Sequence, residues 1–348
     1  MLSKDDFLDA TFRFGQPESN NSLGDDLGGT ERVSGTSWKE PGYEGTIDYR
    51  IRQLSYSSIL TLHTCPRKFE LYKKRSTHRE EDSLKSTITF NFGHIVGEGI
   101  QLIFQDLEWN DILWKLFLNW EVDLFASDEK ANKSFWSAII ALQRFKSIRE
   151  EGFLKDYELV SFHGKPACEL SFCINLLDSF RLRGYVDVVL AHRITGEVVV
   201  IECKTTGNKT VDPAQYKNSA QAIGYSVVLD TICPDVSSYK VIYLVYQSSQ
   251  REWIQFDFIK TYLMRAQWIR ELLLEVDKIK MYEEAGVYPM HGESCYSFYR
   301  PCEYINTCTL STEYLTKPCT SEEEDKMEYQ FNINLATLLE AQFNKVES

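Results

Sequence analysis

Alternating hydrophobic and polar positions divide the chain into helical and extended segments. Apolar residues recur at helical spacing through SILTLHTCPRKFELYKK, where Ser57 can act as the N-cap and Cys65 falls on the apolar side. A second helix is expected from Phe92, and residues 106–152 show the pattern of two or three amphipathic helices. The first half of the chain is therefore predicted to be largely helical.

Three segments with the pattern of β-strands follow: CELSFCINL, SFRLRGYVDVVLAHR and GEVVVIECKTT. A turn at Thr195 and Gly196 joins the last two, which predicts an antiparallel meander. A helix over 212–232, a strand over 239–247, a short strand at 253–258 and a long helix over 259–285 are expected next. This order indicates an α/β or α+β core.

The two ends of the chain differ from this middle region in composition. Residues 1–48 are rich in Gly, Ser, Asn and Asp without a sustained period, which predicts a flexible N-terminal arm. One domain is expected over 49–310, followed by a polar C-terminal tail over 311–348. The first residues lack a signal-peptide pattern and no apolar run is long enough to cross a bilayer, so we expect a cytoplasmic protein without membrane contact.

Acidic residues outnumber basic ones by 51 to 38, so the molecule as a whole would repel a phosphate backbone. This balance argues against nonspecific coating of nucleic acid. A local group of basic side chains nevertheless follows Cys65, and it is either a DNA contact or a solvated helix face. The residues assigned to DNA binding are Arg67, Lys68, Lys73, Lys74 and Arg75.

Three charged residues stand inside strands that are otherwise apolar. Glu202 and Lys204 share one face of their strand, and the turn before it can place Asp187 beside them. Such charges are costly to bury unless they are paired or hold a metal. A buried salt bridge is one interpretation. The other is a hard cation, Mg²⁺ or Mn²⁺, held by the two carboxylates and backbone oxygens, with Lys204 orienting or deprotonating its water.

The order of three motifs resembles the PD-(D/E)XK nuclease superfamily, and its RecB-like branch in particular. The motifs are G-x-x-D ending at Asp187, E-x-K ending at Lys204, and Q-x-x-x-Y from Gln221 to Tyr225. The resemblance implies a restriction-endonuclease-like α/β core, with a mixed central sheet flanked by helices, a helical insertion and a cysteine-clamped C-terminus. The layout is similar to phage-encoded members, which implies a DNA exonuclease of phage replication, recombination or processing in the host cytoplasm.

The resemblance also implies a role for each matched residue. The metal ligands would be Asp187, Glu202 and the backbone carbonyl of Cys203, while Gln221 and Tyr225 would place the DNA backbone. Val186 stands where the family name has proline, and CPRKFELY and FGHIVGEGI resemble two family helices. Gly97 occupies the position of the family histidine, so His94, one turn earlier, and Glu169 are the candidate additional ligands. Helix packing is the alternative role for Tyr225.

Four cysteines form a second candidate centre. Cys65 precedes the core, and Cys295, Cys302 and Cys308 follow it, an arrangement that resembles AddB-type and CRISPR-adaptation nucleases with a [4Fe–4S] cluster. The spacing after Cys295 is longer than the usual Cys-x-x-Cys. Zinc and free thiols are the alternatives, and Cys319 is a substitute ligand.

Two other classes of function compete with a nuclease. A non-catalytic module that binds DNA ends or a partner would retain the fold, and Gly97 at the histidine position favours it. An interaction protein that mimics DNA is suggested by net charge alone. No G-x-x-x-x-G-K-[ST] loop is present, so ATP-driven unwinding would need a helicase or another recombination or replication protein as partner.

Overall fold

The structure is a computed structural model that describes residues 48–74, 84–162, 164–232, 239–297, 300–311 and 329–343. The predicted N-terminal arm lies outside the described residues except for Asp48, as do Arg75 and Cys319. Among the described helices, none combines the length and the hydrophobicity that a membrane span needs.

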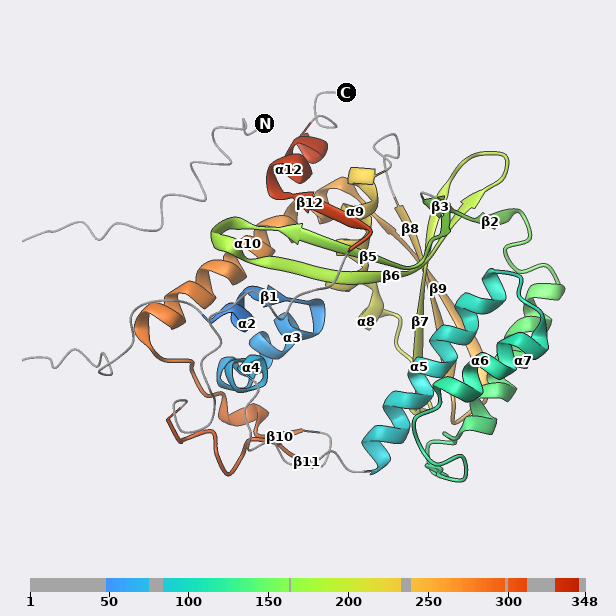
Figure 1. Ribbon diagram of the computed structural model, residues 1–348, viewed down its shortest axis with the longest axis horizontal. Helices are drawn as coiled ribbons and strands as arrows, with labels where there is room; N and C mark the ends of the chain where they lie inside the picture. The colour runs from blue at the N-terminus through green and yellow to red at the C-terminus, as the bar shows by residue number, and fades with distance from the viewer. Residues whose placement is uncertain are drawn as a thin grey trace, which may run out of the picture.

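The centre of the fold is an eight-stranded mixed sheet with the path β12-β5-β6-β7-β8-β9 (Figure 1). The predicted meander is present: β5 (Cys168–Asn175), β6 (Arg181–His192) and β7 (Val198–Thr206) pair antiparallel. β8 (Tyr239–Gln247) runs parallel to β7 and antiparallel to β9 (Glu252–Lys260). The predicted α/β class with a mixed central sheet flanked by helices is therefore confirmed.

Shorter elements complete the sheet and cover it. The strands β1 (Gln53–Leu54) and β2 (Tyr157–Leu159) both pair with β6, and two small hairpins are β3 (Ser161–Phe162) with β4 (Lys165–Pro166) and β10 (Tyr296–Ser297) with β11 (Arg300–Pro301). The helices are α2 (Tyr49–Arg52), α3 (Tyr56–Thr64), α4 (Pro66–Lys73), α5 (Leu84–Phe104), α6 (Trp109–Asn119), α7 (Phe135–Glu150), α8 (Ala214–Lys217), α9 (Ala220–Ile232), α10 (Tyr262–Ala285) and α12 (Leu335–Phe343).

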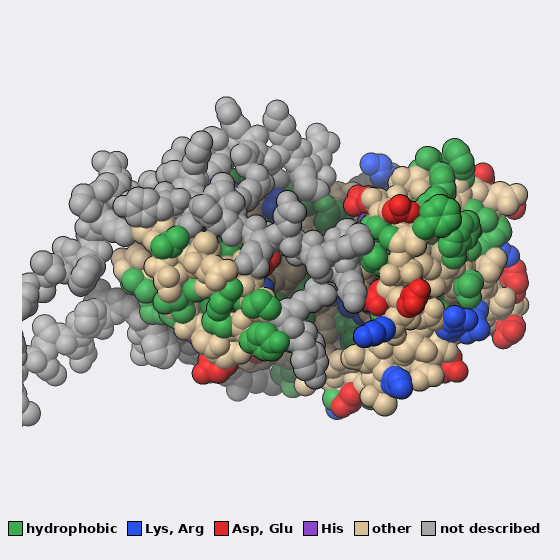
Figure 2. All heavy atoms as spheres, turned by 90° about the horizontal axis from the view of Figure 1, so that it is seen from below, with side chains coloured by type: hydrophobic (Ala, Val, Ile, Leu, Met, Phe, Trp, Pro, Cys, Tyr) green, Lys and Arg blue, Asp and Glu red, His purple; other side chains and the backbone are tan. Residues whose placement is uncertain are grey.

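The alternation of side chains along β7 separates two hydrophobic cores. Val198 and Val200 join the core formed with α9, α10 and α12, whereas Val199 and Ile201 join the core formed with α5, α6 and α7. α6 and α7 fall within the predicted helical insertion, about 106–152. Together with α5 they lie on one side of the molecule (Figure 1), which is the right-hand lobe of Figure 2. A strand buried on both faces explains the uninterrupted apolar run before Glu202.

The helix predicted through Cys65 is broken there, and its N-cap lies two residues before the predicted one. Ser55, not Ser57, is the cap, with its Oγ accepting the Ser58 N–H at 3.2 Å. Cys65 has an extended backbone, φ −160° and ψ 110°, because the ring of Pro66 disfavours the helical region for the residue before it. Cys65 is buried, as predicted.

Other boundaries also differ from the expectations. α5 begins at Leu84 rather than Phe92, and the helix expected over 212–232 is split between α8 and α9. β9 extends to Lys260, so α10 begins only at Tyr262. Part of the predicted C-terminal tail returns to the sheet: β12 (Phe331–Asn334) runs parallel to β5, and α12 follows it.

Candidate active site

Asp187 and Glu202 lie where β6 and β7 separate. The ladder between the two strands pairs Val188 with Ile201 and does not continue to the next residue of each strand. Instead, Asp187 Oδ2 accepts a hydrogen bond from the backbone N–H of Cys203 at 3.1 Å. The carboxylate thus satisfies a main-chain donor that the parted strands leave free, and this places it beside Glu202.

Glu202 is the most deeply buried charged group of this site, with 0% of the residue exposed. Lys204 Nζ forms an ion pair with Glu202 Oε1 at 2.5 Å. Apart from that ion pair, no donor in the described part of the chain satisfies either Glu202 oxygen at hydrogen-bond geometry. A buried carboxylate with unsatisfied oxygens is costly, and a bound cation would remove that cost.

The charges of the site act strongly on one another. Burial, reinforced by the charge of Glu202, raises the pKa of Asp187 well above its ordinary value. Burial also opposes the charge on Lys204, but Glu202 and Asp187 outweigh it and raise the pKa of the ammonium group. In the metal-free chain Lys204 is therefore a cation at neutral pH and a hydrogen-bond donor.

α9 adds two polar side chains to the same network. Lys204 Nζ donates to Gln221 Oε1 at 3.1 Å, and Gln221 Nε2 donates to the Tyr225 hydroxyl at 2.5 Å. The two residues share a helical face because they are four positions apart. Burial and the nearby carboxylates raise the pKa of Tyr225, so its hydroxyl stays protonated. The structure therefore brings Asp187, Glu202, Lys204, Gln221 and Tyr225 together.

Glu169 lies next to Asp187 in strand register. Cys168 pairs with Val188 and Leu170 pairs with Val186, so Glu169 falls opposite Asp187. Its backbone leaves the regular strand, with φ +47°, and the side chain is exposed. Gln101 Nε2 on α5 lies 3.4 Å from Glu169 Oε1. Sequence reasoning missed Gln101, although its spacing of four from Gly97 was a usable signal.

α5 crosses the sheet near the two carboxylates. A Cβ atom on Gly93 would lie 3.3 Å from Thr205 Oγ1 on β7, and Gln101 reaches Glu169 on β5. Gly97 is halfway between them, and a Cβ there would meet nothing within 4 Å. A side chain at Gly97 would therefore have open space around its first carbon. His94 is exposed.

The donor set for a metal is incomplete in these side-chain positions. In the described ranges, no group of three or more His, Cys, Asp or Glu side chains is arranged to hold a metal ion. Asp187 and Glu202 supply two carboxylates, with unsatisfied oxygens on Glu202 that suit a hard cation. The additional ligand roles of His94 and Glu169 remain predictions.

The four predicted cluster cysteines converge on one region. Cys302 and Cys308 pack against buried Leu71 and Tyr304, and the Cys302 N–H donates to the Cys295 carbonyl at 2.8 Å. Burial raises the pKa of the Cys308 thiol, and the charges of Cys295, Cys302 and Cys65 act in the same direction. The thiols thus lie near one another, but they are not in a metal-holding arrangement.

The basic group on α4 makes contacts within the chain. Arg67 donates to the carbonyl of Cys308 at 2.9 Å and also contacts Glu70 and the Leu310 carbonyl. The remaining described members are also engaged: Lys68 with Glu303 at 3.4 Å, Lys73 with the Gln53 carbonyl, and Lys74 with Glu70 at 3.1 Å and Glu283 at 3.4 Å. Their role in DNA binding remains a prediction.

Comparison with known proteins agrees with the motif order. A model of the PD-(D/E)XK nuclease superfamily matches residues 53–309. No curated protein matches the chain. A solved structure described as "Crystal structure of SSO0001" is 12% identical, with 66% of this chain and 76% of that chain covered and a TM-score of 0.31. A similarity at that level carries no argument about the site.

Proposed function

Since the chain belongs to the PD-(D/E)XK nuclease superfamily, we propose that it hydrolyses phosphodiester bonds of DNA with Mg²⁺ or Mn²⁺, as an exonuclease in phage DNA replication, recombination or processing. The observation that supports this most directly is the network at the parted strands. An ion pair and two hydrogen bonds join Glu202, Lys204, Gln221 and Tyr225. Asp187 is held beside this network by the backbone N–H of Cys203.

The metal would be held by Asp187, Glu202 and the backbone carbonyl of Cys203. A bound divalent cation supplies positive charge to a phosphate oxygen and lowers the pKa of a coordinated water. Glu202 is suited to this role because it is buried and, apart from the ion pair with Lys204, its oxygens lack hydrogen-bond donors among the described residues. His94 and Glu169 are the proposed additional ligands.

Lys204 would act on the attacking water or on the phosphate as a cation. Its raised pKa favours donation of a hydrogen bond over removal of a proton. Gln221 holds the ammonium group from the α9 side, and Tyr225 holds Gln221. Together these two side chains would fix the direction of the lysine and contact the DNA backbone beside it.

A nuclease assay on end-labelled single-stranded and double-stranded DNA tests this proposal. Purified chain should cleave at least one substrate in Mn²⁺ or Mg²⁺ and neither substrate in chelator. Mononucleotide products would identify an exonuclease, and internal fragments an endonuclease. DNA binding without cleavage in either metal would instead favour the non-catalytic module, for which the open space at Gly97 is the supporting observation.

A [4Fe–4S] cluster on Cys65, Cys295, Cys302 and Cys308 is the second part of the proposal, with zinc as the alternative. The convergence of the four thiols supports it. Such a cluster would connect α4 to the segment after α10, which Arg67 already links through its hydrogen bond to the Cys308 carbonyl. It would have a structural role rather than one in hydrolysis.

A further inference from the structure

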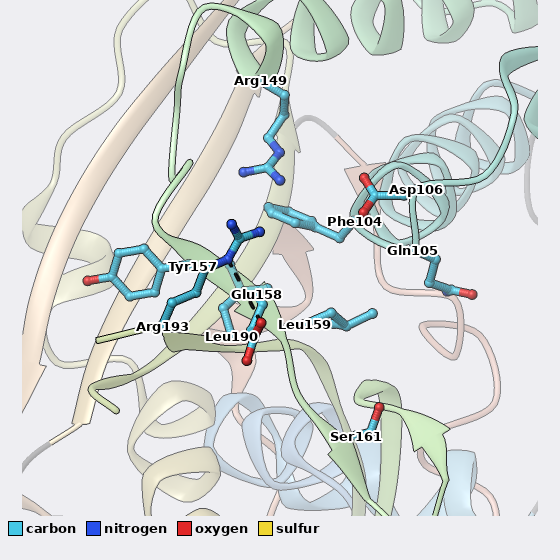
Figure 3. A pocket seen from close by; sticks show the side chains of 10 residues that line it. All are labelled: Phe104, Gln105, Asp106, Arg149, Tyr157, Glu158, Leu159, Ser161, Leu190 and Arg193. Carbon is cyan, nitrogen blue, oxygen red and sulfur yellow. Dashed lines mark ion pairs between the residues drawn. The ribbon is translucent and has the colours of Figure 1, made fainter. Parts of the chain in front are cut away.

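A pocket of about 380 Å³ lies on the α5–α7 side of the sheet, where α5 ends. Its walls come from the ends of α5 and α7, from β2 and from the end of β6 (Figure 3). Two of the lining side chains are Arg149 and Arg193, and Figure 3 shows their guanidinium groups pointing toward each other. Neither arginine belongs to the motifs that predicted the active site.

Arg149 is held in one position by its surroundings. Its Nη1 donates to the carbonyl of Phe153 at 2.6 Å and to that of Leu154 at 3.2 Å. The guanidinium also lies over the Phe104 ring, 4.7 Å from its centroid. These hydrogen bonds go to neutral carbonyls, so the positive charge stays available to an anion. An arginine fixed in this way loses little side-chain entropy when it binds a ligand.

Burial, together with the charge of Arg193, lowers the pKa of Arg149, while Asp106 opposes that shift. The two guanidinium groups are thus close enough to repel each other. A negative group placed between them would relieve this repulsion. A phosphate suits that position because guanidinium groups bind its oxygens in pairs.

The acidic residues of the pocket bind the two arginines only weakly. Glu158 Oε2 lies 3.8 Å from Arg193 Nε, beyond hydrogen-bond distance, and their side chains are 63% and 60% exposed. An ion pair this exposed contributes little stability, so a phosphate could replace it. Asp106 also lines the pocket and partly offsets the positive charge, which favours a phosphate with a single charge, such as a phosphodiester.

The pocket is connected to the candidate active site by two elements. Directly after α5, Gln105 lines the pocket one turn beyond Gln101, which contacts Glu169. On β6, Leu190 lines the pocket three residues after Asp187. Three strand residues span about 10 Å. Leu190 packs in the core on the α5–α7 side, whereas Gln221 and Tyr225 reach the candidate active site from α9. The pocket would therefore hold a part of the nucleic acid that lies away from the bond to be cleaved.

We propose that the pocket between Arg149 and Arg193 binds a phosphate group of the nucleic-acid strand that occupies the candidate active site, at a position away from the bond to be cleaved. This inference rests on the proposed function. It assigns to two arginines the positioning of the strand, which the acidic surface of the protein would otherwise repel. A free phosphomonoester, such as a nucleotide product, shares the same chemistry and is the other source of the ligand.

The first test is DNA binding in chelator, so that cleavage plays no part. The probe is a fluorescein-labelled, 12-nucleotide thymidine oligonucleotide, measured by anisotropy at several salt concentrations with the full chain. Arg193→Gln should weaken binding about tenfold, because one charge-assisted contact is lost. The salt slope should fall by about one. Arg149→Lys should also weaken binding, because it keeps the charge but loses the paired donors.

Arg270→Gln is the matched control, because Arg270 is exposed on α10 and outside the pocket. It should change neither affinity nor salt slope. Melting temperatures of all variants separate binding defects from folding defects. Equal affinity and equal slope in wild type, Arg193→Gln and Arg270→Gln would overturn the strand-binding role.

A second measurement distinguishes the two sources of phosphate. Inorganic phosphate or thymidine 5′-monophosphate at millimolar concentration is added in a thermal-shift assay. Stabilisation of wild type but not of Arg193→Gln, with unchanged oligonucleotide affinity, would show that the pocket takes a free phosphomonoester and not the strand. No effect of Arg193→Gln in either assay would remove the pocket as a phosphate site. If the wild-type chain cleaves no DNA but the two binding assays give the expected results, only the proposed nuclease activity is refuted.

Discussion

Lys204 is the residue on which the proposed chemistry depends most. It touches Glu202 and Gln221, and its ammonium group compensates the buried carboxylate. We predict that Lys204→Ala lowers the cleavage rate by at least about 100-fold, the scale of a lost proton-transfer or charge-stabilising group. Single-turnover cleavage of labelled DNA in Mn²⁺ measures this effect.

The melting temperature shows whether Lys204→Ala loses cleavage because the positive charge beside Glu202 is missing. Without metal, Lys204→Ala leaves Glu202 uncompensated and should lower the melting temperature. Saturating Mn²⁺ should restore much of that loss, since the cation replaces the missing charge. Lys146→Ala, at a surface ion pair on α7, should change neither property. Cleavage at the wild-type rate by Lys204→Ala would remove this lysine from the mechanism.

The raised pKa of Asp187 gives a prediction with a definite sign. The folded chain holds this proton more tightly than the unfolded chain, in which an aspartate titrates near about 4. Metal-free stability should therefore fall as the pH rises from that value through the raised pKa, where the carboxylate ionises beside Glu202. Mn²⁺ must displace the proton, so its affinity should increase with pH over the same range.

Calorimetry of Mn²⁺ binding in two buffers of different ionisation enthalpy measures the released proton. Wild type should release it below the raised pKa, and Asp187→Asn should not. The variant should also bind Mn²⁺ about tenfold more weakly or worse, because a charged ligand is lost while shape is kept. Proton release that persists in Asp187→Asn would assign the titration to a different group.

The main residues of the site could be predicted from the sequence because they are charged while their neighbours in the strand are apolar. Charged Asp187, Glu202 and Lys204 stand in apolar strands, and motif order connects them with Gln221 and Tyr225 on α9. The pairing of Arg149 with Arg193 could not be predicted. These residues are far apart in sequence, belong to different elements, and become neighbours only when α7 packs over the end of β6.

At the level of elements, the pattern predicted strands better than helix boundaries. The strands contain apolar runs that are easy to recognise, such as Val198–Ile201 in the first half of β7. The helices α3 and α4 share one continuous apolar periodicity, so only Pro66 marks their separation. β12 was not among the expected strands, because its apolar–polar alternation covers only four residues within a polar region.

Two glycines of α5 offer a matched test of how this helix is packed. A Cβ on Gly99 would lie 2.3 Å from Leu142 Cδ1 on α7, whereas a Cβ on Gly97 meets nothing within 4 Å. Gly99→Ala should therefore lower the free energy of unfolding by about 1–3 kcal/mol through overpacking. Gly97→Ala should raise it by about 0.5–1 kcal/mol, because alanine favours the helix.

Denaturant unfolding of the two variants measures these changes under identical conditions. Equal effects of the two substitutions would contradict the packing of α5 against α7. A larger side chain at Gly97 also examines the family histidine position, since added bulk there should reduce cleavage before it reduces stability.

At the level of the whole molecule, the cysteines connect segments that are distant in sequence. A cluster on Cys65, Cys295, Cys302 and Cys308 would link the start of the fold to its end. Cys302→Ser should lower the melting temperature substantially, because ligand binding contributes directly to folding. Cys168→Ser should do much less, since that thiol packs beside α5 and contacts the Gln101 carbonyl.

The metal itself is identified on protein purified without oxygen. Visible absorbance with comparable amounts of iron and sulfide is expected, and both should be lost in Cys302→Ser. Zinc without iron would show that the four cysteines hold the alternative metal. Protein without either metal would leave four ordinary thiols, and the nuclease proposal would then depend on the carboxylate network alone.

The position of β12 has a consequence during protein synthesis. It covers the outer edge of β5, with Phe331 beside Phe172 and Ile333 beside Ile174. β5 leaves the ribosome long before its partner, by about 8 to 30 s at translation rates of about 5–20 residues per second. Throughout that interval an apolar strand edge can pair with the same strand of a neighbouring nascent chain. Dense polysomes should therefore favour aggregation, and slower initiation or a chaperone that binds extended segments should increase the soluble yield.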